Sequence, residues 1–124
     1  MAGKIVADTL EHSTAGSLDT QYVVNGSAKA WNSFQGTGTI VFIKSFQCSS
    51  LVDANTGDYD VNLTSAMDST SYSVLVSSGY NVVHNASETL GYANTTTQYS
   101  TLHYENNTRY DIPYLSGQIN GDLA

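Results

Sequence analysis

Basic residues are scarce in this chain of 124 residues, which has four lysines and arginines against eleven aspartates and glutamates. The net charge of −7 opposes binding to nucleic acid, because clustered lysine and arginine are needed to neutralise a phosphate backbone. The sequence also lacks the run of about 18 apolar residues that a membrane-spanning helix needs. No apolar segment typical of a secretory signal follows the first methionine. We therefore expect no nucleic-acid partner and no membrane insertion.

Cysteine, proline and tryptophan occur once each. The single Cys48 cannot form an intramolecular disulfide, and its alternating surroundings predict a small buried residue. Pro113 has no amide donor, which predicts a strand at a sheet edge or a subunit boundary. Trp31 and Phe34 are expected to anchor the core, because large aromatic side chains bury the most area. The alternative for Trp31 is stacking on a sugar.

Serine, threonine and asparagine are abundant, at about a third of the chain, and tyrosine occurs nine times. This composition favours pleated sheet and polar loops, since β-branched and aromatic side chains suit half-buried strands. The length fits a single domain with a modest core.

The clearest pattern runs from residue 37 to residue 76. Residues 58–64 alternate polar and apolar side chains, and residues 71–76 place Tyr72, Val74 and Val76 on one side, as strands with one buried face do. Residues 53–58 contain the Asn, Gly and Asp of a tight reversal. Further strands are predicted, some shorter, over the following residues: 5–6, 21–24, 28–31, 40–43, 45–48, 80–84, 98–104 and 109–114.

Residues that are common in turns predict the form of three other stretches. Asn25-Gly26 predicts a hairpin turn, residues 13–17 a loop, and residues 85–92 a polar connection, with a helical turn capped by Ser87 as the alternative. About eight short strands without an amphipathic helix predict an all-β fold, an antiparallel, jelly-roll-like β-sandwich. Residues 1–19 are expected to form an amino-terminal docking segment, and residues 20–124 the single β-sandwich domain.

Residues suited to catalysis or metal binding are few. The three histidines are far apart in the sequence, no Gly-x-Ser-x-Gly motif occurs, and no pair of carboxylates is marked. We therefore expect no enzymatic activity and no cofactor. Asp53, Asn55, Asp58 and Asp60 are the only dense cluster of oxygen ligands and are candidates for calcium. Their spacing fails the EF-hand pattern, which favours a hairpin turn with solvated carboxylates.

Several short elements follow one another in a distinctive order along the first half of the chain. A signature at residues 22–31 is followed by a Phe-x-Gly-Thr-Gly-Thr element at 34–39 and a Ser-Phe-x-x-Ser-Ser-x-x-Asp segment at 45–53. A Thr-Gly-Asp-Tyr turn at 56–59 then leads to a strand that ends in an Ala-Met pair at 66–67. The order of these elements resembles that of phage tail-fibre and related virion surface proteins, particularly from marine bacteriophages and prophages. The resemblance covers roughly residues 20 to 76.

The resemblance implies a non-catalytic virion component, expected to be a homotrimer, with an outward-facing β-domain. Residues 1–19 would dock onto other virion proteins, and the position on the particle stays open between tail fibre, tail tip and a capsid decoration or head-fibre protein. A carbohydrate-binding adhesin is a second hypothesis from a different class. Its candidates for stacking on host glycans are four tyrosines, Tyr80, Tyr92, Tyr99 and Tyr104.

Overall fold

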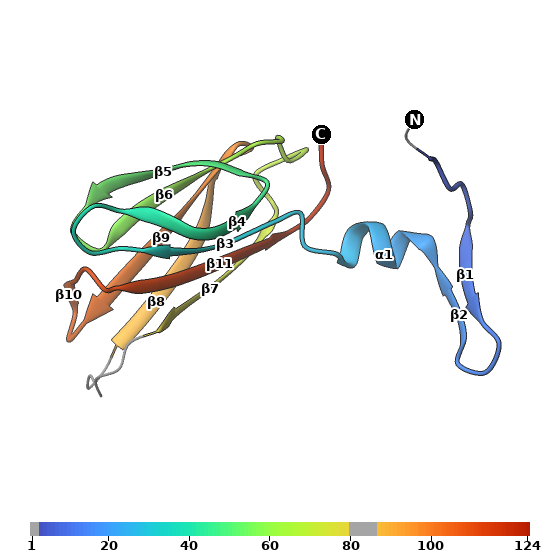
Figure 1. The fold of residues 1–124 in the computed structure, drawn as a ribbon, viewed down its shortest axis with the longest axis horizontal. Helices are drawn as coiled ribbons and strands as arrows, with labels where there is room; N and C mark the ends of the chain where they lie inside the picture. The colour runs from blue at the N-terminus through green and yellow to red at the C-terminus, as the bar shows by residue number, and fades with distance from the viewer. Residues whose placement is uncertain (1–2, 80–86) are drawn as a thin grey trace.

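The computed structural model describes residues 3–79 and 87–124, which contain eleven strands and one helix (Figure 1). The prediction of an all-β antiparallel fold is confirmed, with more strands than expected. In chain order the elements are β1 (Thr9–His12), β2 (Gly16–Asp19), α1 (Thr20–Gly26), β3 (Ala30–Gln35), β4 (Val41–Phe46), β5 (Cys48–Asn55), β6 (Asp58–Leu63), β7 (Ser73–Gly79), β8 (Ser87–Thr95), β9 (Gln98–Glu105), β10 (Thr108–Arg109) and β11 (Tyr114–Asn120).

Two antiparallel sheets face each other in a sandwich-like arrangement. One sheet has the order β4-β3-β11-β7, and we call it the neutral sheet because no acidic residue lies on its strands. The other has β5, β6, β9 and β8 side by side, with the short β10 paired to the end of β9, and we call it the acidic sheet. A jelly-roll connectivity stays a prediction.

The core lies between the sheets and follows from strand alternation. Phe34, Tyr59, Val61 and Leu115 are each 0% exposed, and the rings of Phe34 and Tyr59 meet edge to face with centroids 5.4 Å apart. Every second residue of β6 points into this core, as the alternation of residues 58–64 predicted. The turn before β6 is also confirmed, with Gly57 at a φ of 62° that suits glycine.

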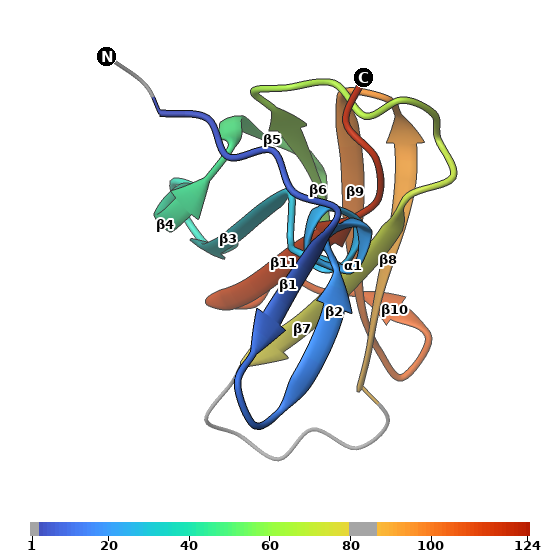
Figure 2. The same cartoon turned by 90° about the vertical axis from the view of Figure 1, so that its right-hand side faces the viewer.

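The amino-terminal arm, which we define as residues 3–26, projects beyond one end of the sandwich (Figure 1). It consists of the β1-β2 hairpin and α1, and Figure 2 looks at the sandwich end with this hairpin in front. The sequence predicted a strand at 5–6 and a loop at 13–17. The structure has no strand at 5–6. It pairs β1 with β2 around a turn at residues 13–15, within the predicted loop, and Gly16 at the start of β2 has a φ of 92°.

The predicted strand at 21–24 and the hairpin turn at Asn25-Gly26 are wrong, because this segment is α1. None of the strands in residues 3–79 and 87–124 pairs with this segment, so the local hydrogen bonds of a helix satisfy its backbone groups. Its end is capped within the chain: Ser27 donates from N and Oγ to the carbonyl of Val23, at 3.2 and 2.6 Å, and Lys29 Nζ donates to that of Val24. With seven residues α1 is short, and the described part of the chain has no helix with the length and hydropathy of a membrane span.

The carboxyl-terminal third differs from the prediction in three places. β8 begins at Ser87, where a polar connection or a capped helical turn was expected. The predicted strand at 109–114 is β10 followed by a loop, and the last long strand is β11, which is central between β3 and β7. Pro113 is therefore not in an edge strand but precedes a central one, where its missing donor removes no ladder bond. The strand at 80–84 lies outside the described residues.

Trp31 also departs from the prediction, because it lies on the outer face of the neutral sheet and is 38% exposed. Phe34 is in the core as expected, and the two positions are three residues apart on one strand. An odd spacing in a strand places two side chains on opposite faces. Cys48 is half-buried and packs against the core.

Candidate functional site

The outer face of the acidic sheet carries most of the candidate residues. Alternation along β6 turns Asp58, Asp60 and Asn62 outward, because Tyr59, Val61 and Leu63 fill the core. The register with β9 places Asp60 opposite Ser100 and Asn62 opposite Gln98. This face therefore combines carboxylates, amides and a hydroxyl on neighbouring rigid strands.

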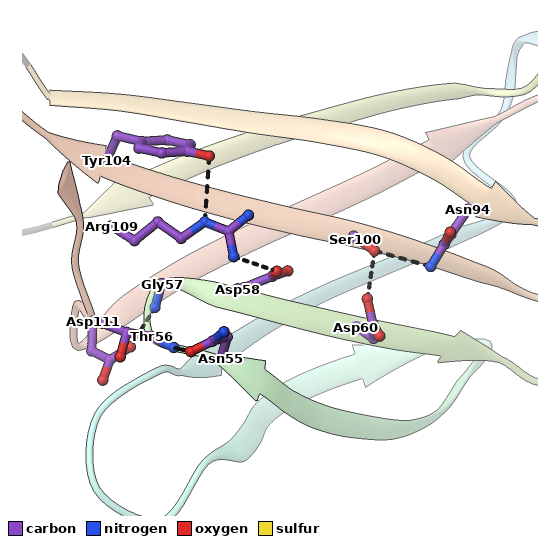
Figure 3. A network of polar contacts seen from close by, with 10 residues as sticks. All are labelled: Asn55, Thr56, Gly57, Asp58, Asp60, Asn94, Ser100, Tyr104, Arg109 and Asp111. Atoms are coloured by element: carbon purple, nitrogen blue, oxygen red, sulfur yellow. Dashed lines mark hydrogen bonds and ion pairs between the residues drawn. The ribbon is translucent and has the colours of Figure 1, made fainter. Parts of the chain in front are cut away.

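The polar side chains at one end of this face form a connected network (Figure 3). Asn94 Nδ2 donates to Gln98 Oε1 at 2.7 Å and to Ser100 Oγ at 3.3 Å, and Ser100 Oγ donates to Asp60 Oδ1. Gln98 Nε2 in turn donates to Asn62 Oδ1 at 3.1 Å. Such contacts fix the rotamers of the outward groups and thereby preorganise the surface.

Arg109 organises the other end of the same face (Figure 3). Its Nη1 lies 2.8 Å from Asp58 Oδ2, and its Nε donates to the Tyr104 hydroxyl at 3.4 Å. The guanidinium carbon is 5.9 Å from the centre of the Tyr104 ring, within the range of a cation–π contact. The hydrogen bond to Tyr104 and the nearby Asp58 raise the pKa of Arg109. Solvent reaches the Arg109 side of this pair and screens it, so the main effect of Arg109 is to orient the Tyr104 ring.

Two of the four predicted tyrosines lie on this face. Tyr92 is 44% exposed and lies opposite Ser100, while Tyr104 is half-buried beneath Arg109. Tyr99 is wrong as a stacking candidate: it is 1% exposed and receives a hydrogen bond from Asn32 in the core, where burial raises its pKa. The reason is its odd separation from Tyr104 along β9. Tyr80 lies outside the described residues.

The calcium candidates have partners within the protein. Asn55 Oδ1 accepts from the amide of Thr56 at 3.0 Å, Asp58 pairs with Arg109, and Asp60 accepts from Ser100. Asp53 is exposed on β5, opposite Tyr59. Within residues 3–79 and 87–124, no three His, Cys, Asp or Glu side chains are grouped so that they could hold a metal ion. Calcium binding by these four residues stays the alternative to the favoured hairpin turn.

Asp111 is a structurally important residue that the sequence did not reveal. Its Oδ1 accepts from the amide of Gly57 at 2.6 Å and lies 2.8 Å from the Tyr59 hydroxyl, which also lies 2.5 Å from the carbonyl of Gly36. Burial, followed by the neighbouring Asp111, raises the pKa of Tyr59. Asp111 thus fastens the β5-β6 turn at the edge of the candidate face (Figure 3). Its partners are more than 50 positions away, so no local motif marks it.

Comparison with known proteins gave no match among protein-family models, curated proteins or solved structures.

Proposed function

We propose that this chain is a structural protein of a bacteriophage virion, a tail-fibre-like surface component anchored by its amino-terminal arm and without catalytic activity. The resemblance of residues 20–76 to virion surface proteins supports a place on the bacteriophage particle. The observation that carries the anchoring role is the exposure of the arm. Ile5, Val6 and Val24 are 90%, 81% and 60% exposed, and α1 has no buried residue.

The arm depends on a partner for physical reasons. A two-stranded hairpin is marginally stable in water, and so is a helix of seven residues that has no buried residue. Exposing Ile5, Val6 and Val24 adds an unfavourable apolar surface to both elements. Burial of this surface against other virion proteins would remove that cost and order the arm. In this proposal the sandwich faces outward and the arm docks on the particle, at the tail or on the capsid.

The test compares the full chain with a truncated chain of residues 27–124 in binding to phage particles that lack the protein. We expect the full chain to remain on washed particles and the truncated chain to be lost. A full-length Val23→Asp/Val24→Asp variant should be lost as well, because it places charges on the docking surface. Val41→Asp is the matched control, since Val41 is 53% exposed on the sandwich and should not affect docking.

Retention of the truncated chain on washed particles would refute anchoring by the arm. Absence of the full chain from particles would refute the virion role itself. Electron microscopy of particles labelled with an antibody to the chain would distinguish a tail fibre from a capsid decoration or head-fibre protein.

A carbohydrate-binding adhesin is the second candidate, favoured by the outer face of the acidic sheet. Tyr92 and Tyr104 offer aromatic surface there, and the network around Asp60 and Asn94 offers fixed donors and acceptors for sugar hydroxyls. Tyr92→Ala and Tyr104→Ala should then weaken binding to host glycans. Tyr22→Ala, an exposed tyrosine of the arm, is the control. Equal binding by all three variants would argue against this face.

A further inference from the structure

The outer face of the neutral sheet differs in charge from the rest of the molecule. None of the eleven acidic residues lies on β3, β4, β7 or β11, although the chain carries a net charge of −7. Lys44 is the one charged residue on these four strands, all of which the structure describes. This face also exposes large side chains: Trp31 at 38%, Phe46 at 48% and Leu75 at 58%.

One row of cross-strand neighbours brings these side chains together. Phe46 on β4 pairs with Trp31 on β3, Trp31 pairs with Gln118 on β11, and Gln118 pairs with Leu75 on β7. The rings of Trp31 and Phe46 are stacked, with centroids 6.3 Å apart and planes inclined by 20°. The row therefore begins with a stacked pair of aromatic rings and ends with an aliphatic side chain.

A groove of about 420 Å³ lies over β11 between these two ends. Trp31 and Leu75 lie on the strands that flank β11, two strand spacings or about 9–10 Å apart. Between them the outward side chains are polar and uncharged, with Ser77, Ser116 and Gln118 in the lining. Gln118 is held in place by a hydrogen bond of 3.0 Å from its Nε2 to Asn120 Oδ1.

We propose that this groove binds a segment of a neutral glycan. A pyranose ring has an apolar face of C–H groups that packs on an aromatic plane, and its rim of hydroxyls needs donors and acceptors such as Ser77, Ser116 and Gln118. The groove has no charged lining residue that would select an acidic sugar, and the net charge of −7 repels polyanions. This site goes beyond the proposed function, which assigns no ligand to the neutral sheet.

A wholly apolar occupant fits the groove less well. It would cover the Ser and Gln groups without returning their hydrogen bonds to water, and each polar group buried in this way costs free energy. A second copy of the chain would also cover the aromatic pair, and its own net charge of −7 opposes that approach. Both remain distinguishable from a glycan by experiment.

Trp31 is the only tryptophan of the chain, so its fluorescence reports directly on the groove. The probes are neutral oligosaccharides of four to six sugar units from glucan, mannan and galactan series, titrated into the full chain. We expect at least one series to give a saturable blue shift of the emission, because stacking removes the indole from water. Isothermal calorimetry gives the dissociation constant without relying on the fluorophore.

The variants decide which face is responsible. Trp31→Ala should weaken binding about tenfold or more and Gln118→Ala less, while Trp31→Phe should retain most of the affinity by calorimetry. Tyr22→Ala, an exposed tyrosine of the arm, is the control and should leave the dissociation constant unchanged. Thermal melting of each variant confirms that it is folded, which is expected because the three side chains are exposed.

Three results would overturn the proposal. One is the absence of saturable binding of any series at millimolar sugar. Another is loss of binding in Tyr92→Ala but not in Trp31→Ala, which would move the site to the acidic sheet. The third is a blue shift produced by raising the protein concentration alone, which would assign this face to a second copy. None of them bears on whether the arm docks on particles, so the proposed function stands or fails separately.

Discussion

Removing the carboxylate of Asp111 should destabilise the sandwich more than removing any other single surface charge of this region. Asp111 Oδ1 accepts from the amide of Gly57 at 2.6 Å and lies 2.8 Å from the Tyr59 hydroxyl. Gly57 is buried and its carbonyl also accepts from the amide of His103 at 2.8 Å, so the turn is held from two sides. Asp111→Ala leaves the Gly57 amide without its acceptor.

The magnitude follows from these contacts. A buried amide that loses its partner costs about 1–3 kcal/mol, and a hydrogen bond to a charged group contributes at the upper end of that range. Tyr59 keeps the carbonyl of Gly36 at 2.5 Å, so its hydroxyl is not left without an acceptor. We therefore expect Asp111→Ala to lower the free energy of unfolding by about 2–3 kcal/mol. Asp111→Asn, which keeps an acceptor but loses the charge, should cost about 1 kcal/mol.

Urea denaturation followed by circular dichroism measures this difference. An unchanged slope of the unfolding free energy against urea concentration shows that only the stability has altered. For a chain of this size the loss corresponds to a fall in melting temperature of about 10 °C. Asp53→Ala is the matched control, because Asp53 is an exposed carboxylate on the neighbouring strand, and it should lie within about 0.5 kcal/mol of the wild type. If Asp111→Ala and Asp53→Ala unfold at the same urea concentration, the role given to Asp111 is wrong.

Three further predictions concern the core. Gly117→Ala should lower the free energy of unfolding in urea by about 3 kcal/mol or more, because the added Cβ would overlap the Tyr99 hydroxyl. Gly79→Ala is the control: its added Cβ would have its nearest contact at 3.6 Å, so the free energy of unfolding should hardly change. Burial raises the pKa of Tyr59, Tyr72 and Tyr99 in the folded chain above the unfolded value of about 10. The contribution of these protonated hydroxyls to stability is therefore complete below pH 10. It is lost as the pH rises towards the pKa values of the folded chain. Unfolding free energies measured from pH 9 to 12 should fall at the alkaline end, and less steeply in Tyr99→Phe; a flat profile would contradict this. Burial also raises the pKa of Cys48, so its thiol should react with a disulfide reagent at pH 8 more slowly in the folded chain than in urea.

Strand alternation and turn chemistry were enough to predict the middle of the fold. The β5-β6 hairpin and the buried face of β6 follow from residues 53–64 alone, because each contact that fixes them is local or repeats with period two. The same rule, applied strictly, would have corrected two errors. Once Phe34 is placed in the core, Trp31 must face outward, and Tyr99 and Tyr104 cannot share a face.

Long-range contacts could not be predicted from the sequence. Residues 21–24 have the pattern of a strand, but a strand needs a neighbour to pair with. Among the strands that the structure describes, none pairs with α1. β11 contains Gly117, which local propensity disfavours in a strand. A glycine is needed at position 117 because the Tyr99 hydroxyl fills the space that a side chain there would occupy. The groove on the neutral sheet likewise depends on a register of three strands that no local motif reveals.

The expected homotrimer and the glycan groove constrain each other. If three copies packed through their acidic sheets, Asp58 and Asp60 of each copy would approach the carboxylates of the other copies, which repel them. If they packed through their neutral sheets, Trp31 would be covered and the groove closed to a glycan. The arm offers a third surface, because Ile5 and Val6 are exposed on it and it projects beyond one end of the sandwich (Figure 1). If both proposals hold, light scattering after size exclusion should find a trimer for the full chain and a monomer for residues 27–124. A trimer of the truncated chain would place the contact on a sheet, and quenching of Trp31 by acrylamide would show whether the groove is then closed.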